Sequence, residues 1–277
     1  MKSRIKQIPL ARKLYWQLTK FNYQKRFASN GYGTFLGVFD TFEQAIQSAP
    51  KTKDIGYNST ELAQEYAQML EDRNWEGSRR VIAEYDYPVL FWLSQILHQA
   101  ETEQEIKTSV FDFGGNVGVH FYAYRNYIDS IKNIEWTVCD VEEIAKIGKA
   151  TAQKRSIPNL SFTSTFEDIN GKDIFIASGS VQYVHKLAQQ LSHLKKPRHI
   201  LINRLSLYDG DEFVTLQNGG KVFYPQYVFN KDKFIAQLNQ IGYKLIDIWE
   251  DKHDSCMIPS HPEKSLPFYY GLYLKLE

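Results

Sequence analysis

A short apolar strand in the middle of this chain runs directly into a glycine-rich bend. The segment reads Val110-Phe111-Asp112-Phe113-Gly114-Gly115-Asn116-Val117-Gly118, and an apolar helical stretch follows it. Glycines in such a bend let a ligand come closer to the backbone than any Cβ would allow. A strand that ends in this way places the ligand at the carboxyl edge of a parallel sheet. The segment therefore predicts an α/β fold with a cofactor-binding turn.

Two common phosphate-binding loops do not fit this bend. A dinucleotide fingerprint needs Gly-x-Gly-x-x-Gly, and the spacing from Gly115 and Gly118 puts Phe113 where the first glycine belongs. A P-loop needs Gly-Lys-Ser/Thr, but Gly118 is followed by Val119 and His120. The pattern disfavours a nicotinamide oxidoreductase and excludes a P-loop nucleotide-binding protein.

The bend instead resembles motif I of class I S-adenosylmethionine-dependent methyltransferases. In that motif an acidic residue is followed by glycines two, four and six positions on, which here are Asp112, Gly114, Asn116 and Gly118, with Gly115 also in the turn. Asn tolerates positive φ better than other non-glycine residues, so the bend is expected to survive at Asn116. The Asp112 carboxylate suits a ligand that carries an ammonium and a sulfonium. The resemblance implies S-adenosyl-L-methionine as the cofactor.

A second acidic residue ends the next expected strand, at 134–140. Asp140 stands where a carboxylate can accept hydrogen bonds from both hydroxyls of a cofactor ribose. The same residue also suits the N-cap of the helix expected over 141–155. The two roles are compatible, and the sequence leaves both open.

The alternation of strands and helices continues to the carboxyl terminus. Asn230 is expected to cap a helix that ends before Gly242. Seven strands predict a doubly wound, Rossmann-like α/β sheet, and the last two form the hairpin that a class I methyltransferase fold requires. The expected strands are 110–113, 134–140, 160–164, 173–180, 198–205, 243–249 and 268–276, with helices at 141–155, 184–194 and 231–241.

Five further segments sharpen the resemblance. They are Phe111-Asp112-Phe113-Gly114-Gly115, Ala177-Ser178-Gly179-Ser180-Val181-Gln182-Tyr183, Asn203-Arg204-Leu205-Ser206-Leu207, Gln217-Asn218 and Tyr227-Val228-Phe229-Asn230. Together they resemble a bacterial family of methyltransferases associated with surface-polysaccharide gene clusters. The likeness covers most of the chain and implies a fold and a cofactor, but no particular substrate.

Composition favours a cytoplasmic enzyme. The 277 residues are 43% hydrophobic and 23% charged, enough for one large core. Two cysteines offer neither a disulfide framework nor a metal cluster. No apolar run is long enough to span a bilayer or to act as a signal peptide. A net charge of +1 argues against nucleic acid as a partner.

The amino-terminal region, 1–105, is expected to be a helical extension or lid, followed by an S-adenosylmethionine-binding domain at 106–277. Further helices are expected at 59–73, capped by Ser59 or Thr60, and at 88–100, where they would shape an acceptor pocket. Eight Lys or Arg residues lie between Met1 and Arg26, with Leu10, Leu14, Leu18 and Phe21 at helical spacing. This basic amphipathic helix suits docking on the core, with peripheral contact to a membrane or an anionic substrate as the alternative. The oligomeric state is left open.

Methyl transfer mainly requires positioning of the acceptor, with a general base when the acceptor is a hydroxyl. His185 is the predicted base because it follows the strand that ends at Ser178 and Gly179, which are expected to lie against the cofactor. His120 is expected to lie near the cofactor or in local packing rather than to act as the base. His253 and His261 flank the loop at 254–262, which can close over a ligand. The residues expected to contact the acceptor are Gln182, Tyr183, Arg204 and Tyr208.

No residues with metal-ligand spacing occur, and the motif that marks amino methylation of bases is absent. The sequence therefore predicts metal-independent methylation, favouring oxygen, on a small molecule or sugar acceptor. Because Asn116 replaces a glycine, a noncatalytic regulatory or scaffold protein that binds S-adenosylmethionine is the alternative.

Overall fold

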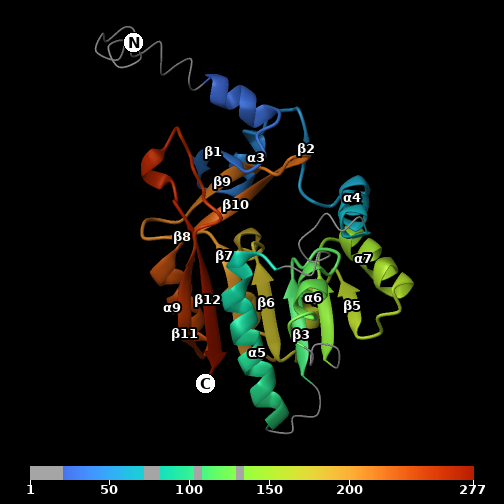
Figure 1. The fold of residues 1–277 in the computed structure, drawn as a ribbon. Coiled ribbons are helices and arrows are strands. Elements are labelled where there is room, and N and C mark those ends of the chain that lie inside the picture. Colours follow the sequence, from blue (N-terminus) through green and yellow to red (C-terminus); the bar gives the residue numbers. More distant parts are fainter. Residues whose placement is uncertain (1–20, 72–81, 103–107, 129–133) are drawn as a thin grey trace.

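A seven-stranded sheet forms the centre of the protein (Figure 1). The computed structural model of the chain describes residues 21–71, 82–102, 108–128 and 134–277. The five strands from β7 to β5 are parallel, whereas β12 is antiparallel to both of its neighbours. This confirms the predicted doubly wound sheet and its closing hairpin. In spatial order the strands are β11 (Tyr243–Asp251), β12 (Tyr269–Leu276), β7 (His199–Leu205), β6 (Ile174–Ser178), β3 (Ser109–Phe113), β4 (Glu135–Cys139) and β5 (Leu160–Thr163).

Side chains that alternate along the strands build a core on each face of this sheet. On one face Val110 and Trp136 pack in a cluster with four helices, α4 (Thr60–Glu71), α5 (Tyr87–Thr102), α6 (Val119–Tyr124) and α7 (Glu142–Lys154). On the other face Phe111 and Phe175 pack with α8 (Leu187–Ser192) and α9 (Lys231–Gln240). Strands buried on both faces explain the nearly continuous apolar runs in the sequence.

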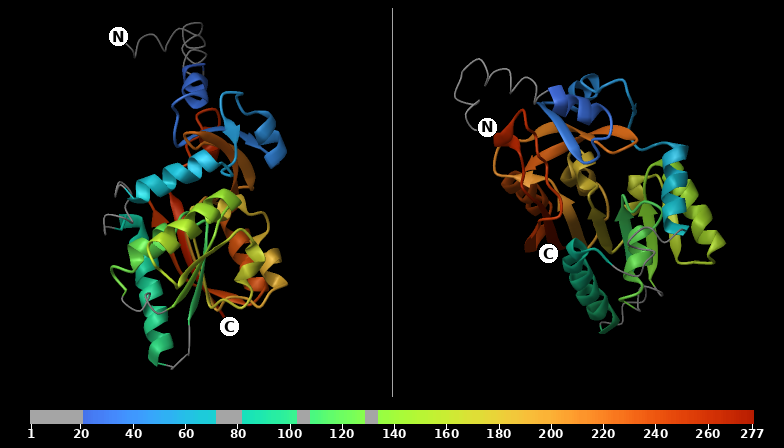
Figure 2. Two further views of the ribbon diagram at one scale, coloured as in Figure 1. Left: turned by 90° about the vertical axis from the view of Figure 1, so that its right-hand side faces the viewer. Right: turned by 45° about the horizontal axis from the view of Figure 1, so that its top comes forward.

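A second, smaller sheet lies beyond the carboxyl ends of the parallel strands (Figures 1 and 2). Its order is β1 (Thr34–Phe39), β9 (Phe213–Asn218), β10 (Val222–Asn230) and β2 (Asp54–Ile55), with β8 (Leu207–Tyr208) paired to β10. Helix α3 (Phe42–Gln47) packs beside β1, β9 and β10.

This second sheet differs from the sequence prediction, which placed only helices before residue 105. Strands β1 and β2 precede that position and pair with β9 and β10, which follow it. The expected boundary therefore separates two parts of the chain that share one sheet. The alternation of β1 is interrupted at Gly37, whose φ is 75, and β2 has only two residues, so neither strand gave a clear pattern.

The expected basic helix around Leu10, Leu14 and Leu18 lies outside the described residues. Residues 21–28 are helical, and Phe21 is exposed. Downstream, the cap at Asn230 is confirmed, because its side chain accepts a hydrogen bond from the Lys233 N–H at 2.8 Å. The helix expected at 184–194 is shorter, because a short 3₁₀ helix (Val181–Tyr183) and Lys186, with φ 59, precede α8.

Asn203 joins three elements at the carboxyl end of β7. Its side-chain amide donates to the Tyr85 carbonyl at 2.9 Å, beside the 3₁₀ helix η2 (Glu84–Asp86). Its side-chain oxygen accepts from Trp249 Nε1, on β11, at 3.0 Å. Asn203 is only 1% exposed, whereas Tyr85 and Trp249 are half-buried, so the Asn203 amide links these residues from within the core.

We expect Asn203→Ala to lower the free energy of unfolding by about 1–3 kcal/mol, because it removes two hydrogen bonds, each worth about 0.5–1.5 kcal/mol. Urea denaturation followed by circular dichroism measures the change. Asn239→Ala, on the exposed face of α9, is the matched control and should change it by less than about 0.5 kcal/mol. Equal stability of both variants would contradict this account of the contact.

Candidate functional site

A cavity of about 840 Å³ opens between the carboxyl ends of the parallel strands and the second sheet. Its wall includes residues that follow β3, β4 and β6, together with residues of β1, β9 and β10. From β3 the chain proceeds to β4 and β5 on one side and returns to β6 and β7 on the other, so the cavity lies at the topological switch point. Ligands of open α/β sheets bind at this position.

The glycine-rich bend forms part of the cavity wall and has the backbone conformation that its sequence predicts. Gly114 and Asn116 have φ of 71 and 56, which confirms that asparagine supports the bend. A Cβ on Gly114 would lie 2.4 Å from the Ser180 Cβ, and one on Gly115 would lie 2.3 Å from Asp112 Oδ2. The glycines are therefore required by the protein's own packing, and the resulting backbone is open to the cavity.

Asp140 fixes this bend from the neighbouring strand. One carboxylate oxygen accepts from the Asn116 N–H at 2.9 Å, and the other accepts from the Val141 N–H at 2.8 Å. Helix α7 has Val141 as its N-cap residue with no side-chain cap, so Asp140 holds the bend instead of capping the helix. Burial raises the pKa of the Asp140 carboxyl to about 6, although its two backbone hydrogen bonds lower the pKa.

Asp112 lies beneath the bend and away from the cavity wall. It is fully buried, and its two oxygens contact His120 Nδ1 at 2.9 Å and Trp136 Nε1 at 3.1 Å. Gly118 is also behind the wall, where it begins α6 with φ 95. His120 itself lines the cavity.

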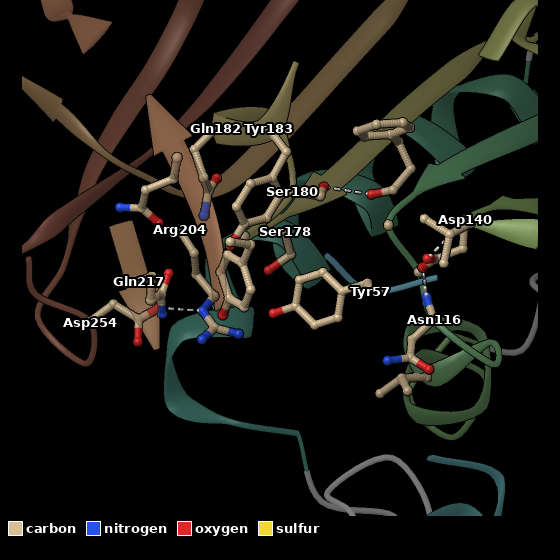
Figure 3. A pocket seen from close by; sticks show the side chains of 18 of the residues that line it. Tyr57, Asn116, Asp140, Ser178, Ser180, Gln182, Tyr183, Arg204, Gln217 and Asp254 are labelled. Atoms are coloured by element: carbon tan, nitrogen blue, oxygen red, sulfur yellow. Dashed lines mark hydrogen bonds and ion pairs between the residues drawn. The ribbon is translucent and has the colours of Figure 1, made fainter. Parts of the chain in front are cut away.

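Arg204 and Asp254 lie at the end of the cavity opposite Asp140 and Asn116 (Figure 3). Arg204 Nε donates to Asp254 Oδ2 at 2.6 Å, and the guanidinium lies 4.6 Å from the centroid of the Tyr85 ring. Burial lowers the pKa of Arg204, but Asp254, Tyr85 and Asp251 together raise that pKa by a larger amount. Arg204 also has φ 55, a strained value for a residue with a long side chain.

Three tyrosines form a second part of the wall (Figure 3). The Tyr57 ring lies 4.5 Å from that of Tyr224 and 6.3 Å from that of Tyr183, and Tyr183 and Tyr224 meet edge to face at 5.3 Å. Burial raises the pKa of the Tyr224 hydroxyl to about 12, and burial also raises the pKa of Tyr57 and of Tyr183 well above the ordinary value. The three hydroxyls are therefore neutral groups that can donate a hydrogen bond.

Three buried polar atoms on this wall have no hydrogen-bond partner among the described residues. They are Ser178 Oγ, Gln182 Oε1 and Gln226 Oε1. Buried polar atoms are nearly always paired, so an unpaired set beside a cavity indicates groups reserved for a ligand or for water. Ser178 and its neighbour Gly179 follow β6, whereas Gln182 and Gln226 belong to the tyrosine side.

The structure does not bring four of the predicted site residues to the cavity. Asp112 and Gly118, predicted to contact the cofactor, lie behind the wall, and the other two are His185 and Tyr208. His185 is exposed, and its ring stacks on Tyr227 at 4.9 Å, because the turn at Lys186 carries it away from the carboxyl ends of the strands. Tyr208 belongs to β8, where its hydroxyl bonds to Asp211 and accepts from Lys264 at 2.9 Å. Neither residue lines the cavity.

Several wall residues were not singled out as site residues from the sequence. Tyr57, Gln217 and Tyr224 reach the cavity only because β2, β9 and β10 form the second sheet. From the sequence, Asp254 was only part of a loop that can close over a ligand. Its pairing with Arg204 depends on the path of the chain after β11. No local pattern marks such residues.

Within the described ranges, no group of three or more His, Cys, Asp or Glu side chains has an arrangement suited to a metal ion. In the same part of the chain, no helix combines the length and apolar character that crossing a membrane requires.

No protein-family model and no curated protein matches this chain. Solved structures that resemble it include Burkholderia thailandensis 1,6-didemethyltoxoflavin-N1-methyltransferase, bound to 1,6-didemethyltoxoflavin and S-adenosylhomocysteine, with 15% identity over 78% of this chain and 87% of that chain and a TM-score of 0.43. A S-adenosylmethionine-dependent methyltransferase from Clostridium acetobutylicum has 11% identity over 77% of this chain and 98% of that chain, with a TM-score of 0.46. Another S-adenosylmethionine-dependent methyltransferase, from Mesorhizobium loti, has 12% identity over 70% of this chain and 98% of that chain, with a TM-score of 0.43. Likeness at this level carries no argument about the reaction, which is inferred from the cavity.

We expect the Asp140 carboxyl to titrate near pH 6 in the ligand-free protein, because burial disfavours its charged form. Because the pKa is higher in the folded than in the unfolded state, the protonated carboxyl adds to the free energy of unfolding below about pH 4. This contribution is lost as the pH rises through about 6. Carboxyl ¹³C NMR, with Asp140→Asn to assign the resonance, measures the midpoint. A midpoint near the unfolded value of about 3.9 would contradict this environment.

Proposed function

We propose that this protein is a methyltransferase that uses S-adenosyl-L-methionine to methylate a hydroxyl of a small molecule or sugar. The observation that carries the proposal is the Asp140 carboxylate, which lies beside a glycine-rich bend at the switch point of a sheet with this strand order. A carboxylate at this strand end suits the two hydroxyls of a ribose.

The residues around the bend fit a sulfonium nucleoside. Asp140 would accept from the ribose hydroxyls, and the exposed backbone at Gly114, Gly115 and Asn116 would lie along the ligand. Ser178 Oγ, which has no partner among the described residues, would contact the methionine portion beside Gly179. When bound, the cofactor supplies an electrophilic methyl carbon. Asp112 and Gly118 act from behind the wall by fixing the shape of the bend.

The tyrosine side of the cavity is the proposed acceptor site. Gln182 and Gln226 present unpaired carbonyl oxygens, which suit a ligand that donates hydrogen bonds. Tyr57, Tyr183 and Tyr224 provide neutral aromatic surfaces against which a ring can stack. Arg204 closes this end of the cavity, with Nε committed to Asp254.

The proposal places the enzyme in the cytoplasm, where a reducing environment suits its two free, buried cysteines. A glycan of a surface-polysaccharide pathway is one acceptor class that the sequence resemblance supports. Incubation with methyl-labelled cofactor and a panel of monosaccharides, nucleotide sugars and phenols tests transfer. Cofactor binding without transfer to any panel member would favour the noncatalytic alternative.

We expect Asp140→Asn to raise the dissociation constant for S-adenosylmethionine by about 10- to 100-fold. The neutral amide loses hydrogen bonds of a charged acceptor, worth about 1.5–3 kcal/mol each, and 1.4 kcal/mol corresponds to a tenfold change. Isothermal titration calorimetry measures the affinity, and Asp232→Asn, on the exposed first turn of α9, is the control. Wild-type affinity in Asp140→Asn would refute the assignment of the ribose site.

We expect Gln182→Leu to raise KM for the acceptor by about tenfold while cofactor affinity stays unchanged, because the variant removes one buried acceptor oxygen from the tyrosine side. Initial rates with the best acceptor of the panel, together with calorimetry, separate the two effects. Gln189→Leu, on the exposed face of α8, is the matched control. A loss of cofactor affinity with unchanged KM would place Gln182 in the cofactor site.

A further inference from the structure

Asp112 and His120 form a hydrogen-bonded pair behind the glycine-rich bend. Asp112 is completely buried on β3, yet it carries a carboxylate whose Oδ1 is 2.9 Å from His120 Nδ1. Trp136 Nε1 donates to the second oxygen at 3.1 Å, so the carboxylate has no freedom to turn. The His120 ring also stacks on Tyr124, with centroids 5.6 Å apart and planes 25° apart.

This arrangement sets the proton on His120. An ionised carboxylate only accepts, so Nδ1 carries the hydrogen and the lone pair of neutral imidazole lies on Nε2. The side chain keeps 13% exposure and lines the cavity. A buried acid that orients an imidazole in this way is the relationship of base and orienting group found in nucleophile-activating triads.

We propose that His120, oriented by Asp112, is the general base that takes the proton from the acceptor hydroxyl. The inference rests on the proposed methyl transfer. The hydroxyl oxygen would form its bond to the methyl carbon as the carbon–sulfur bond breaks. The electron pair of the broken bond would stay on sulfur, which would leave as a neutral thioether. The hydroxyl proton passes to Nε2, and the resulting imidazolium loses it to solvent after the product departs.

The charges around His120 suit this task. Burial lowers the pKa of His120, but the charge and hydrogen bond of Asp112, together with the charge of Asp86, outweigh burial and the opposing effect of Arg204. The net pKa lies above the ordinary value of 6.5. A base with a pKa close to the working pH combines proton affinity with a usable neutral fraction.

Two other histidines lack this support. His185 is exposed and lies outside the cavity. His253 lines the cavity, but its ring is exposed and packs on Tyr85 at 4.9 Å, and within the described residues no hydrogen bond orients either ring nitrogen. His120 is the histidine on the cavity wall whose ring is held by a carboxylate.

The test compares His120→Gln and Asp112→Asn with His193→Gln, whose side chain is exposed at the end of α8. We expect His120→Gln to lower kcat by about 10²- to 10⁴-fold, the usual contribution of a positioned base, with the dissociation constant for S-adenosylmethionine unchanged by calorimetry. For the wild type, kcat/KM rises with pH through the pKa of His120. In Asp112→Asn this rise moves to lower pH, because the carboxylate that favours imidazolium is gone. His193→Gln should match the wild type.

A readout without turnover tests the pair directly. Histidine ¹³Cε1 NMR of the ligand-free protein, assigned with His120→Gln, gives the titration midpoint, and Asp112→Asn should lower it. An unchanged midpoint overturns the pairing. If His120→Gln keeps the wild-type kcat, or if its main effect is a loss of cofactor affinity, the base assignment alone is overturned. A wild-type protein that binds cofactor but methylates no acceptor overturns the proposed function and the base assignment together. Thermal melts of each variant identify any loss of folding.

Discussion

The Asp140 carboxylate joins two strands of the sheet at the place where a ligand would bind. Its oxygens hold the Asn116 and Val141 amides at 2.9 and 2.8 Å, so the bend after β3 and the start of α7 are fixed by one side chain. Keeping this charge among protein atoms is unfavourable, as the raised pKa shows. Such a perturbed carboxylate at a cavity wall is typical of a functional site. The cofactor assignment depends on this contact.

Strain is present at both ends of the cavity. Asn116 and Arg204 are two of the four non-glycine residues with positive φ in the described ranges, and both lie on the wall. Asn116 is stabilised by its own side chain, which accepts from the Val117 amide at 2.8 Å, and Arg204 by its ion pair with Asp254. Residues held in such conformations persist when surrounding contacts determine them, and they concentrate at ligand sites.

Local patterns predicted the central sheet well and the acceptor side poorly. The seven strands of the central sheet follow from apolar runs, whereas β8, β9 and β10 were not predicted. The bend at Asn116 follows from the φ preference of asparagine. The second sheet depends on pairing between residues far apart in the chain, such as Thr34 with Asn218, which no local window contains. His185 was preferred as base because of its position after β6, whereas the role proposed for His120 depends on its contact with Asp112, in the strand that precedes α6. Spacing cannot reveal either relationship.

A crystal structure of the protein with S-adenosylhomocysteine tests the central assignment most directly. The account predicts the nucleoside in the cavity between the Asn116 bend and Val141, with both ribose hydroxyls within hydrogen-bonding distance of the Asp140 carboxylate. It also predicts that the sulfur faces the side of the cavity that carries Tyr183 and Gln182. A nucleoside bound outside this cavity, or a ribose that does not contact Asp140, would contradict the account.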